Sequence, residues 1–103
     1  MTFTYVWEYH VQPAHEPAFR RAYGPDGAWV RLFRQAPGYV STRLFRDRDD
    51  PFRFMTVDTW ESEEAHQEFR CRFAEAYAGL DEACEAFTLR ETPLGRFDPV
   101  GDE

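Results

Sequence analysis

The sequence has little positive charge for its 103 residues. Twelve Lys and Arg stand against 19 Asp and Glu, so the formal net charge is −7 at pH 7 with His neutral. Proteins that bind nucleic acid need a basic face that displaces counterions from phosphates, and this composition argues against such a partner. The arginines of the first predicted helix alternate with apolar positions and form no basic run.

Cysteine is also scarce, with only Cys71 and Cys84. A small secreted scaffold held by disulfides would need more of them, so we expect reduced thiols. Neither cysteine forms a ligand-spaced pair on one helix face with His10, His15 or His66. We therefore expect no metal site, a solvated His66 and a loop position for His15.

Several motifs of other protein classes are missing. No apolar run approaches the length of a membrane-spanning helix, and residues 1–5 lack the charged-then-apolar order of a secretory signal. A Gly-rich phosphate loop, a nucleophile elbow and a paired-carboxylate signature are absent as well. We expect a cytoplasmic protein with no membrane partner, whose residues 1–103 form a single domain.

Aromatic residues, in contrast, are abundant: 17% of the chain, with three Trp, five Tyr and ten Phe. Rings at this density indicate either a tightly packed aromatic core or the walls of a pocket. The pattern is clearest from Phe52 to Phe73, where a strand that ends at Trp60 leads into a helix that Ser62 can cap. Apolar residues then recur at helical spacing, which predicts a strand followed by an amphipathic helix.

The remaining segments follow from the same periodicities. Alternation in the first strand places Phe3, Tyr5, Trp7, Tyr9 and Val11 on one face. The expected elements, in chain order, are a strand over 3–11, a helix over 17–36 interrupted at 24–27 with Asp26 as a cap, a strand over 39–46, a polar hairpin over 47–51, a strand over 52–60, a helix over 63–79 with a further turn over 80–84, a strand over 85–91, and an irregular tail from about 92.

This order, β-α-β-β-α-β, predicts an α+β ferredoxin-like fold with a four-stranded antiparallel sheet and two helices on one face. The other face of such a sheet is open. Val6, Val40, Phe45 and Phe54 cannot all point toward the helices, so apolar side chains should remain on the open face. We expect a second copy of the chain to cover that face in a homodimer, with a cavity between sheet and helices or at the seam between the two sheets.

Three segments resemble the antibiotic biosynthesis monooxygenase (ABM) family of the dimeric α/β-barrel superfamily: Val11-Gln12-Pro13, Ala36-Pro37-Gly38-Tyr39, and Thr59 through Ala65 to Phe69. The resemblance spans Phe3 to about Leu89, and the insertion at 24–27 departs from the simplest members. It implies a range of activities. Some members oxidise quinols or anthrone-like phenols with dioxygen and no cofactor, related ones degrade haem, and many have no assigned activity.

The haem-degrading members resemble this chain least. They carry an Asn on the first strand, a Trp inside the second helix and an axial His further along it. Here the corresponding positions offer Tyr9 or His10, then Phe69, then the segment 77–79. The resemblance therefore implies an activity without haem, and we expect no cofactor.

Cofactor-free oxygenation needs a base that titrates near neutral pH and a dry aromatic cavity. His10 is the expected base, because imidazole titrates in that range and Glu8 shares its strand face. Asp58 is the second expected catalytic residue, on one face with Phe54 and Trp60. Two structural alternatives remain open: His10 forms a cross-strand hydrogen bond, and Asp58 pairs with Arg43.

These expectations lead to two hypotheses. The first is a monooxygenase that oxidises a hydroxyaromatic or quinol-like small molecule with dioxygen. The second is a non-catalytic, small-molecule-binding or stress-related module on the same scaffold, since a fold does not decide function. For either, the expected contacts to a small aromatic molecule are Glu8, Arg43, Phe54, Trp60 and Phe69.

Overall fold

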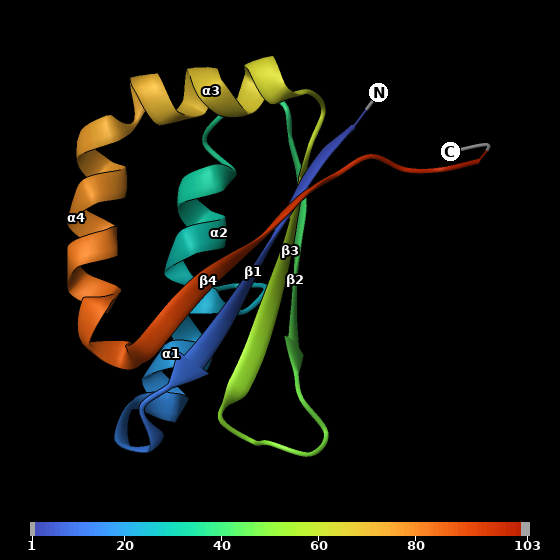
Figure 1. The fold of residues 1–103 in the computed structure, drawn as a ribbon. Helices are drawn as coiled ribbons and strands as arrows, with labels where there is room; N and C mark the ends of the chain where they lie inside the picture. The colour runs from blue at the N-terminus through green and yellow to red at the C-terminus, as the bar shows by residue number, and fades with distance from the viewer. Residues whose placement is uncertain (1, 102–103) are drawn as a thin grey trace.

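The computed structural model describes residues 2–101 (Figure 1). Its elements, in chain order, are β1 (Phe3–Val11), the 3-10 turn η1 (Pro13–His15), α1 (Glu16–Tyr23), α2 (Ala28–Phe33), β2 (Tyr39–Arg46), β3 (Arg53–Trp60), α3 (Glu63–Arg72), α4 (Ala74–Cys84), the 3-10 turn η2 (Glu85–Phe87) and β4 (Thr88–Phe97). The strands form one antiparallel sheet in the order β2-β3-β1-β4. All four helices lie on one side of it (Figure 1). The predicted α+β ferredoxin-like fold is confirmed.

Strict alternation decides which strand side chains face the helices. On β3, Phe54, Thr56, Asp58 and Trp60 are buried, while the intervening residues are more accessible. On β1 the odd-numbered residues pair with them, as Tyr5 does with Asp58. The predicted apolar face of the first strand is therefore the face that the helices cover.

The first helix is interrupted where predicted, between α1 and α2. A β-carbon at Gly27 would lie 2.3 Å from the carbonyl oxygens of Arg21 and Ala22, so only glycine fits this close approach. The predicted cap at Asp26 is wrong, because Gly27 occupies the cap position and no side chain caps α2. The backbone oxygen of Asp26 instead accepts a hydrogen bond of 2.7 Å from Arg31.

The second helix begins as predicted but does not stay continuous. The hydroxyl of Ser62 accepts a hydrogen bond of 3.0 Å from the Ala65 N–H and so caps α3. At Phe73 the backbone leaves the helical region (φ −111°, ψ 26°), and α4 turns sharply down along the sheet (Figure 1). No Pro or Gly marks this bend. It lets Phe69 pack on Trp60 while Tyr77 reaches Trp29, which one straight helix would not allow.

The last strand is longer and later than predicted. Residues 85–87 form a 3-10 turn, and β4 pairs with β1 from Thr88 to Phe97, so the expected irregular tail from 92 is wrong. Pro93 lies within this strand because β4 is an edge strand, where a missing N–H costs no ladder bond. A register shift opposite Val6 and Trp7 accompanies it.

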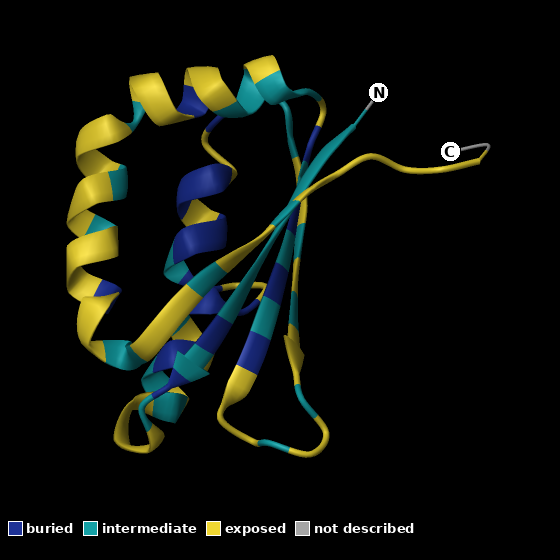
Figure 2. Cartoon of the chain, viewed as in Figure 1, coloured by how far each residue is buried: buried dark blue, intermediate teal, exposed yellow. Residues whose placement is uncertain are grey.

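The core lies between the sheet and the helices (Figure 2), and its fully buried side chains are Val11, Phe19, Trp60 and Phe69. The other face of the sheet is open and partly apolar, with Phe45, Leu94 and Phe97 at 36%, 45% and 50% exposure. Among the described residues, no helix has the length and apolar character to cross a membrane.

Candidate functional site

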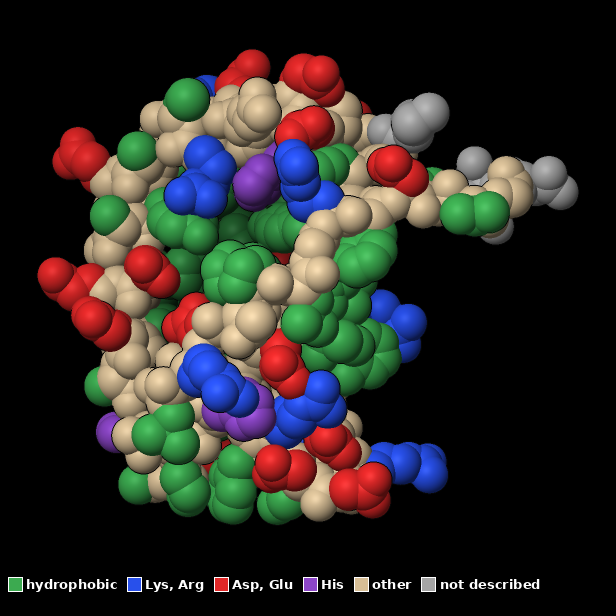
Figure 3. Space-filling model, viewed as in Figure 1, with side chains coloured by type: hydrophobic (Ala, Val, Ile, Leu, Met, Phe, Trp, Pro, Cys, Tyr) green, Lys and Arg blue, Asp and Glu red, His purple; other side chains and the backbone are tan. Residues whose placement is uncertain are grey.

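A cavity of about 630 Å³ lies between the sheet and the helices. Seen as in Figure 1, a hollow floored by apolar side chains opens between α4 and β4 (Figure 3). Its volume is within the range of small-molecule sites, about 300–1,000 Å³. The aromatic side chains that line it are Phe3, Tyr5, Trp7, Tyr9, Tyr23, Trp29, Phe33 and Tyr77.

Asp58 is the buried carboxyl group in the wall that the sheet provides, with 6% exposure. The hydroxyl of Thr42 on the neighbouring strand donates a hydrogen bond to Asp58 Oδ1. Thr42 in turn accepts a hydrogen bond of 2.8 Å from the Tyr39 hydroxyl. Burial raises the pKa of Asp58 from 3.8 to about 6, and the Thr42 hydrogen bond offsets part of that rise. A carboxyl group with such a pKa can exchange protons near neutral pH.

Two tyrosines of β1 add phenol groups to the same wall. Burial raises the pKa of Tyr5, and the nearby Asp58 charge raises it further. Burial likewise raises the pKa of Tyr9, whose hydroxyl lies 3.0 Å from Thr56 Oγ1. Both phenols therefore stay protonated at neutral pH and are able to donate hydrogen bonds.

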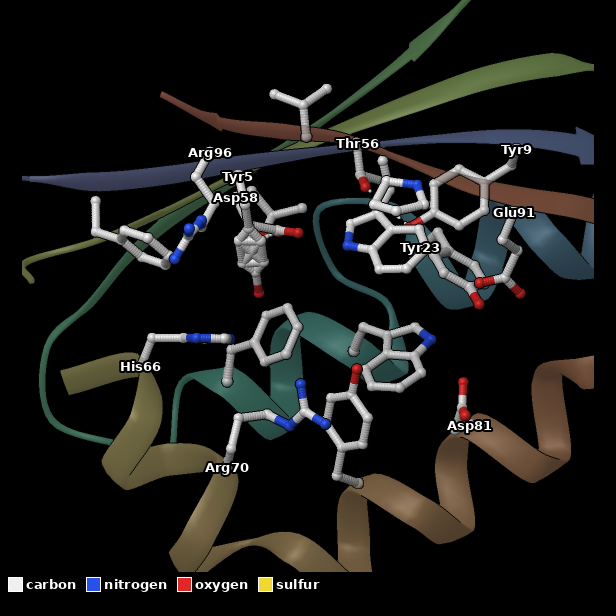
Figure 4. Close-up of a pocket in the computed structure, with 18 of the residues that line it drawn as sticks. Tyr5, Tyr9, Tyr23, Thr56, Asp58, His66, Arg70, Asp81, Glu91 and Arg96 are labelled. Atoms are coloured by element: carbon white, nitrogen blue, oxygen red, sulfur yellow. Dashed lines mark hydrogen bonds between the residues drawn. The ribbon is translucent and has the colours of Figure 1, made fainter. Parts of the chain in front are cut away.

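The opposite wall carries His66 and Arg70 from α3 (Figure 4). The His66 ring packs 4.7 Å from the Tyr5 ring and 5.4 Å from the Trp60 ring, centroid to centroid. Burial, with a smaller contribution from the Arg70 charge, lowers the pKa of His66 from 6.5 to about 4. The ring is thus neutral at neutral pH. The expectation of a solvated His66 is wrong, because the helix turns this side chain toward the sheet.

Charged side chains occupy both ends of the cavity (Figure 4). Arg70 and Arg96 lie at one end, and the Arg96 guanidinium donates a hydrogen bond of 2.9 Å to Glu63. Asp81 and Glu91 lie at the other end. Burial raises the pKa of Glu91, although Thr88 donates a hydrogen bond of 3.1 Å to its carboxylate. The cavity therefore has a cationic end and an acidic end.

The structure places His10 on the open face of the sheet, away from the cavity. Its Nε2 lies 3.1 Å from Arg90 Nη2 and 3.9 Å from Glu8 Oε2. Glu8 also forms an ion pair with Arg53. The cross-strand alternative for His10 is thus the observed one. His10 and Glu8 do not meet Asp58, because alternation along β1 and β3 puts them on opposite faces.

Arg43 is also on the open face, where its guanidinium lies 4.7 Å from the centre of the Phe45 ring. It pairs in register with Val57, whereas its neighbour Thr42 pairs with Asp58. The expected Arg43–Asp58 ion pair is therefore wrong, and the adjacent threonine supplies the polar contact to Asp58.

The expected aromatic contacts Phe54, Trp60 and Phe69 face the helices but belong to the core behind the cavity wall. Phe54 packs 5.0 Å from Phe19, and Trp60 packs 5.1 Å from Phe69. None of the three lines the large cavity. These three side chains pack behind the cavity walls and do not occupy the cavity.

Sequence reasoning missed the polar side chains that the helices and the last strand contribute. His66, Arg70, Tyr77 and Asp81 line the cavity together. Their spacings of four, seven and four residues place them along one helical face, so a periodicity signal was present. Glu91 on β4 pairs with Tyr9 on β1, which puts it on the cavity side of the sheet. A strand was expected to end at Glu91, but the sequence did not show which face of that strand meets the cavity.

Metal binding finds no support in the described part of the chain. Within residues 2–101, no three or more His, Cys, Asp or Glu side chains group closely enough to hold a metal ion.

The fold is shared with solved structures of low sequence identity. SnoaB, a cofactor-independent oxygenase from Streptomyces nogalater, is 20% identical with a TM-score of 0.75 over 98% of this chain and 95% of that one. A putative antibiotic biosynthesis monooxygenase from Bordetella bronchiseptica is 22% identical with a TM-score of 0.75 over 96% and 97%. Rv0793 from Mycobacterium tuberculosis is 16% identical with a TM-score of 0.76 over 99% and 98%.

The sequence itself matches a family model. No match was found among curated proteins. Residues 2–72, however, match the model described as antibiotic biosynthesis monooxygenase. These residues include β1, β3, the Ser62 cap and both halves of the first helix, which carry the fold and most of the cavity wall. The chain belongs to the antibiotic biosynthesis monooxygenase family.

Proposed function

We propose that this protein is a cofactor-independent monooxygenase that oxidises a hydroxyaromatic or quinol-like small molecule with dioxygen. Family membership and the description of SnoaB as a cofactor-independent oxygenase support the reaction class. The observation that carries the proposal is Asp58, a buried carboxyl group with a pKa raised to about 6 in a cavity walled by aromatic rings.

Asp58 acts in this proposal as the general base. Its carboxylate takes the proton of a substrate hydroxyl and leaves an electron-rich aromatic anion. The aromatic walls surround that anion and reduce its contact with water. When a ring methylene is oxidised, its carbon gains one oxygen atom as a carbonyl, and the second oxygen leaves as water with the two methylene hydrogens. The balance needs no reductant besides the substrate.

The other cavity residues bind and orient the substrate. Flat rings can stack against Trp7 and Trp29. The protonated phenols of Tyr5 and Tyr9 can donate hydrogen bonds to substrate oxygens. The neutral His66 ring can hydrogen-bond a substrate hydroxyl without adding a charge.

The second candidate function is small-molecule binding without catalysis. It is favoured by the position of His10, the expected base, which lies outside the cavity. On this hypothesis Asp58 only accepts hydrogen bonds from Thr42 and from a ligand. Both functions predict a ligand in the same cavity, and only the first predicts that dioxygen is consumed.

We also propose that the protein is a homodimer, closed by a second copy over the open sheet face. Phe45, Leu94 and Phe97 leave apolar surface there, next to a shallow hollow of about 210 Å³. Such a patch is costly in water and is covered in an isologous interface. The proposed location is the cytoplasm, consistent with Cys71 and Cys84, which are free thiols in the structure.

The test of the proposed reaction is oxygen uptake, measured with an oxygen electrode on the purified protein across a panel of anthrones, naphthols and quinols. We expect uptake with at least one tricyclic phenol, and coupled formation of a quinone product. Tight binding of such compounds without oxygen uptake would favour the non-catalytic function.

A further inference from the structure

The charged groups of the cavity are separated along its length. Arg70 and Arg96 stand at one end with the neutral His66, while Asp81 and Glu91 stand at the other (Figure 4). Asp58 extends from the sheet, beside Tyr5 (Figure 4). A ligand that carries a charge at one end would therefore be held in one orientation.

Arg70 is the cation whose donors stay available. Its guanidinium carbon lies 4.0 Å from the centre of the Tyr77 ring, so the guanidinium itself packs on an aromatic face. Within residues 2–101, no carboxylate forms a salt bridge with it. Arg96, in contrast, pairs with Glu63 at 2.9 Å. The Arg70 guanidinium can thus donate hydrogen bonds to a planar anion without first breaking an ion pair.

We propose that Arg70, with Arg96 at the same end of the cavity, binds a carboxylate of the substrate, so that the substrate is a polycyclic hydroxyaromatic acid. This inference rests on the proposed function for the hydroxyaromatic rings, and it adds the acid group and its binding residue. The carboxylate lies at the cationic end, and the rings extend along the aromatic walls past Asp58.

The opposite orientation is disfavoured by charge. A carboxylate at the far end would meet the like charges of Asp81 and Glu91, which repel it. A carboxylate beside Asp58 would oppose the ionised form that the reaction needs. Phenol hydroxyls, which donate hydrogen bonds, suit both of these acidic positions. The charge pattern of the cavity therefore favours a ligand with a carboxylate at the cationic end and phenol hydroxyls along the rest of the cavity.

The test uses two anthraquinones that share their rings and phenols and differ in one group: rhein carries a carboxylate where aloe-emodin carries a hydroxymethyl group. Binding is measured by isothermal titration calorimetry at pH 7 for the wild type and for Arg70→Gln. The matched control is Arg72→Gln, because Arg72 lies on the same helix, 5.7 Å from the Phe73 ring, but does not line the cavity.

We expect the wild type to bind rhein about ten- to a hundredfold more tightly than aloe-emodin, since a charge-assisted hydrogen bond is lost in the alcohol. Arg70→Gln should remove the preference for rhein and leave the affinity for aloe-emodin unchanged. Arg72→Gln should keep the preference for rhein. Arg70→Lys should retain part of it. Equal affinities in the wild type, absent rhein binding, or a preference that survives Arg70→Gln would overturn the inference.

A loss of affinity for both ligands in Arg70→Gln would also overturn it, because that result indicates a structural role through Tyr77. The binding result is independent of turnover. A protein that prefers rhein through Arg70 but consumes no oxygen would keep this inference and remove the proposed oxygenase. A protein that consumes oxygen but shows no preference for rhein would keep the proposed oxygenase and remove this inference.

Discussion

Thr42 on β2 donates a hydrogen bond to Asp58 on β3, and this contact sets the protonation of the carboxyl group in the cavity. Burial favours the neutral acid, whereas the hydroxyl donor favours the carboxylate. The balance leaves the pKa of Asp58 near 6 instead of higher. A base with that pKa is mostly ionised at pH 7 and can still accept a proton.

Thr42→Val removes the donor and keeps the side-chain shape. We expect the pKa of Asp58 to rise, because the carboxylate loses its hydrogen bond. The midpoint of the pH–kcat profile should move upward by about one unit. The control is Thr59→Val, since Thr59 hydrogen-bonds Thr4 at 3.2 Å on the other face of the sheet. An unchanged midpoint in the Thr42 variant would show that Asp58 is not the group that the profile reports.

Asp58→Asn should stabilise the folded protein at neutral pH. The pKa of Asp58 is raised from 3.8 to about 6 on folding, so the folded state prefers the protonated acid. This contribution is present below pH 4 and is lost as pH rises through about 6. At pH 7 we expect the variant to be more stable by roughly 1–3 kcal/mol. Asparagine can still accept the Thr42 hydrogen bond.

The measurement for this variant is urea unfolding of both proteins between pH 3.5 and pH 7.5. The difference in the free energy of unfolding should grow with pH over the interval from about 4 to 6. A difference that is constant with pH would contradict a raised pKa for Asp58.

His66 should remain neutral well below its ordinary range. Burial lowers its pKa to about 4, and the Arg70 charge adds to the effect. The folded state therefore loses stability from this group as pH falls from 6.5 toward 4. Proton NMR of the ring should show titration near pH 4 in the wild type, and a higher midpoint in Arg70→Gln. A wild-type midpoint near 6.5 would mean that the ring is solvated.

A charge on the open sheet face should separate the proposed dimer. Leu94→Asp and Phe45→Asp each place a carboxylate on apolar surface that a second copy would bury. Sedimentation equilibrium should give a dimer for the wild type and a monomer for both variants. Ala76→Asp, on the exposed side of α4, serves as the control and should remain dimeric. A monomeric wild type at micromolar concentration would exclude the dimer.

Local patterns predicted the fold because they are set by neighbouring residues. The alternation of β1, the Ser62 cap and the Gly27 interruption each depend on side chains a few positions apart. The bend at Phe73 and the extension of β4 depend on contacts with distant segments, so no local signal marked them.

The candidate site was predicted in part for the same reason. Asp58 was placed on one strand face with Phe54 and Trp60, since alternation fixes that grouping, but the sequence left open which face meets the cavity. His10 was chosen for its chemistry, although alternation puts it on the opposite face of the first strand from Tyr5, Trp7 and Tyr9; the pairing of β1 with β3 then separates it from Asp58. Arg70 and Glu91 come from elements whose direction tertiary packing determines, so only the folded chain places them at the two ends of one cavity (Figure 4).

The most direct measurement of the proposed reaction compares oxygen uptake by Asp58→Asn and His10→Ala with uptake by the wild type. A tricyclic phenol that the wild type oxidises serves as the substrate, and an oxygen electrode provides the readout. We predict a loss of at least about a hundredfold in kcat for Asp58→Asn, the effect of removing a general base, and near wild-type uptake for His10→Ala. Full activity in Asp58→Asn, or its loss in His10→Ala alone, would contradict this prediction.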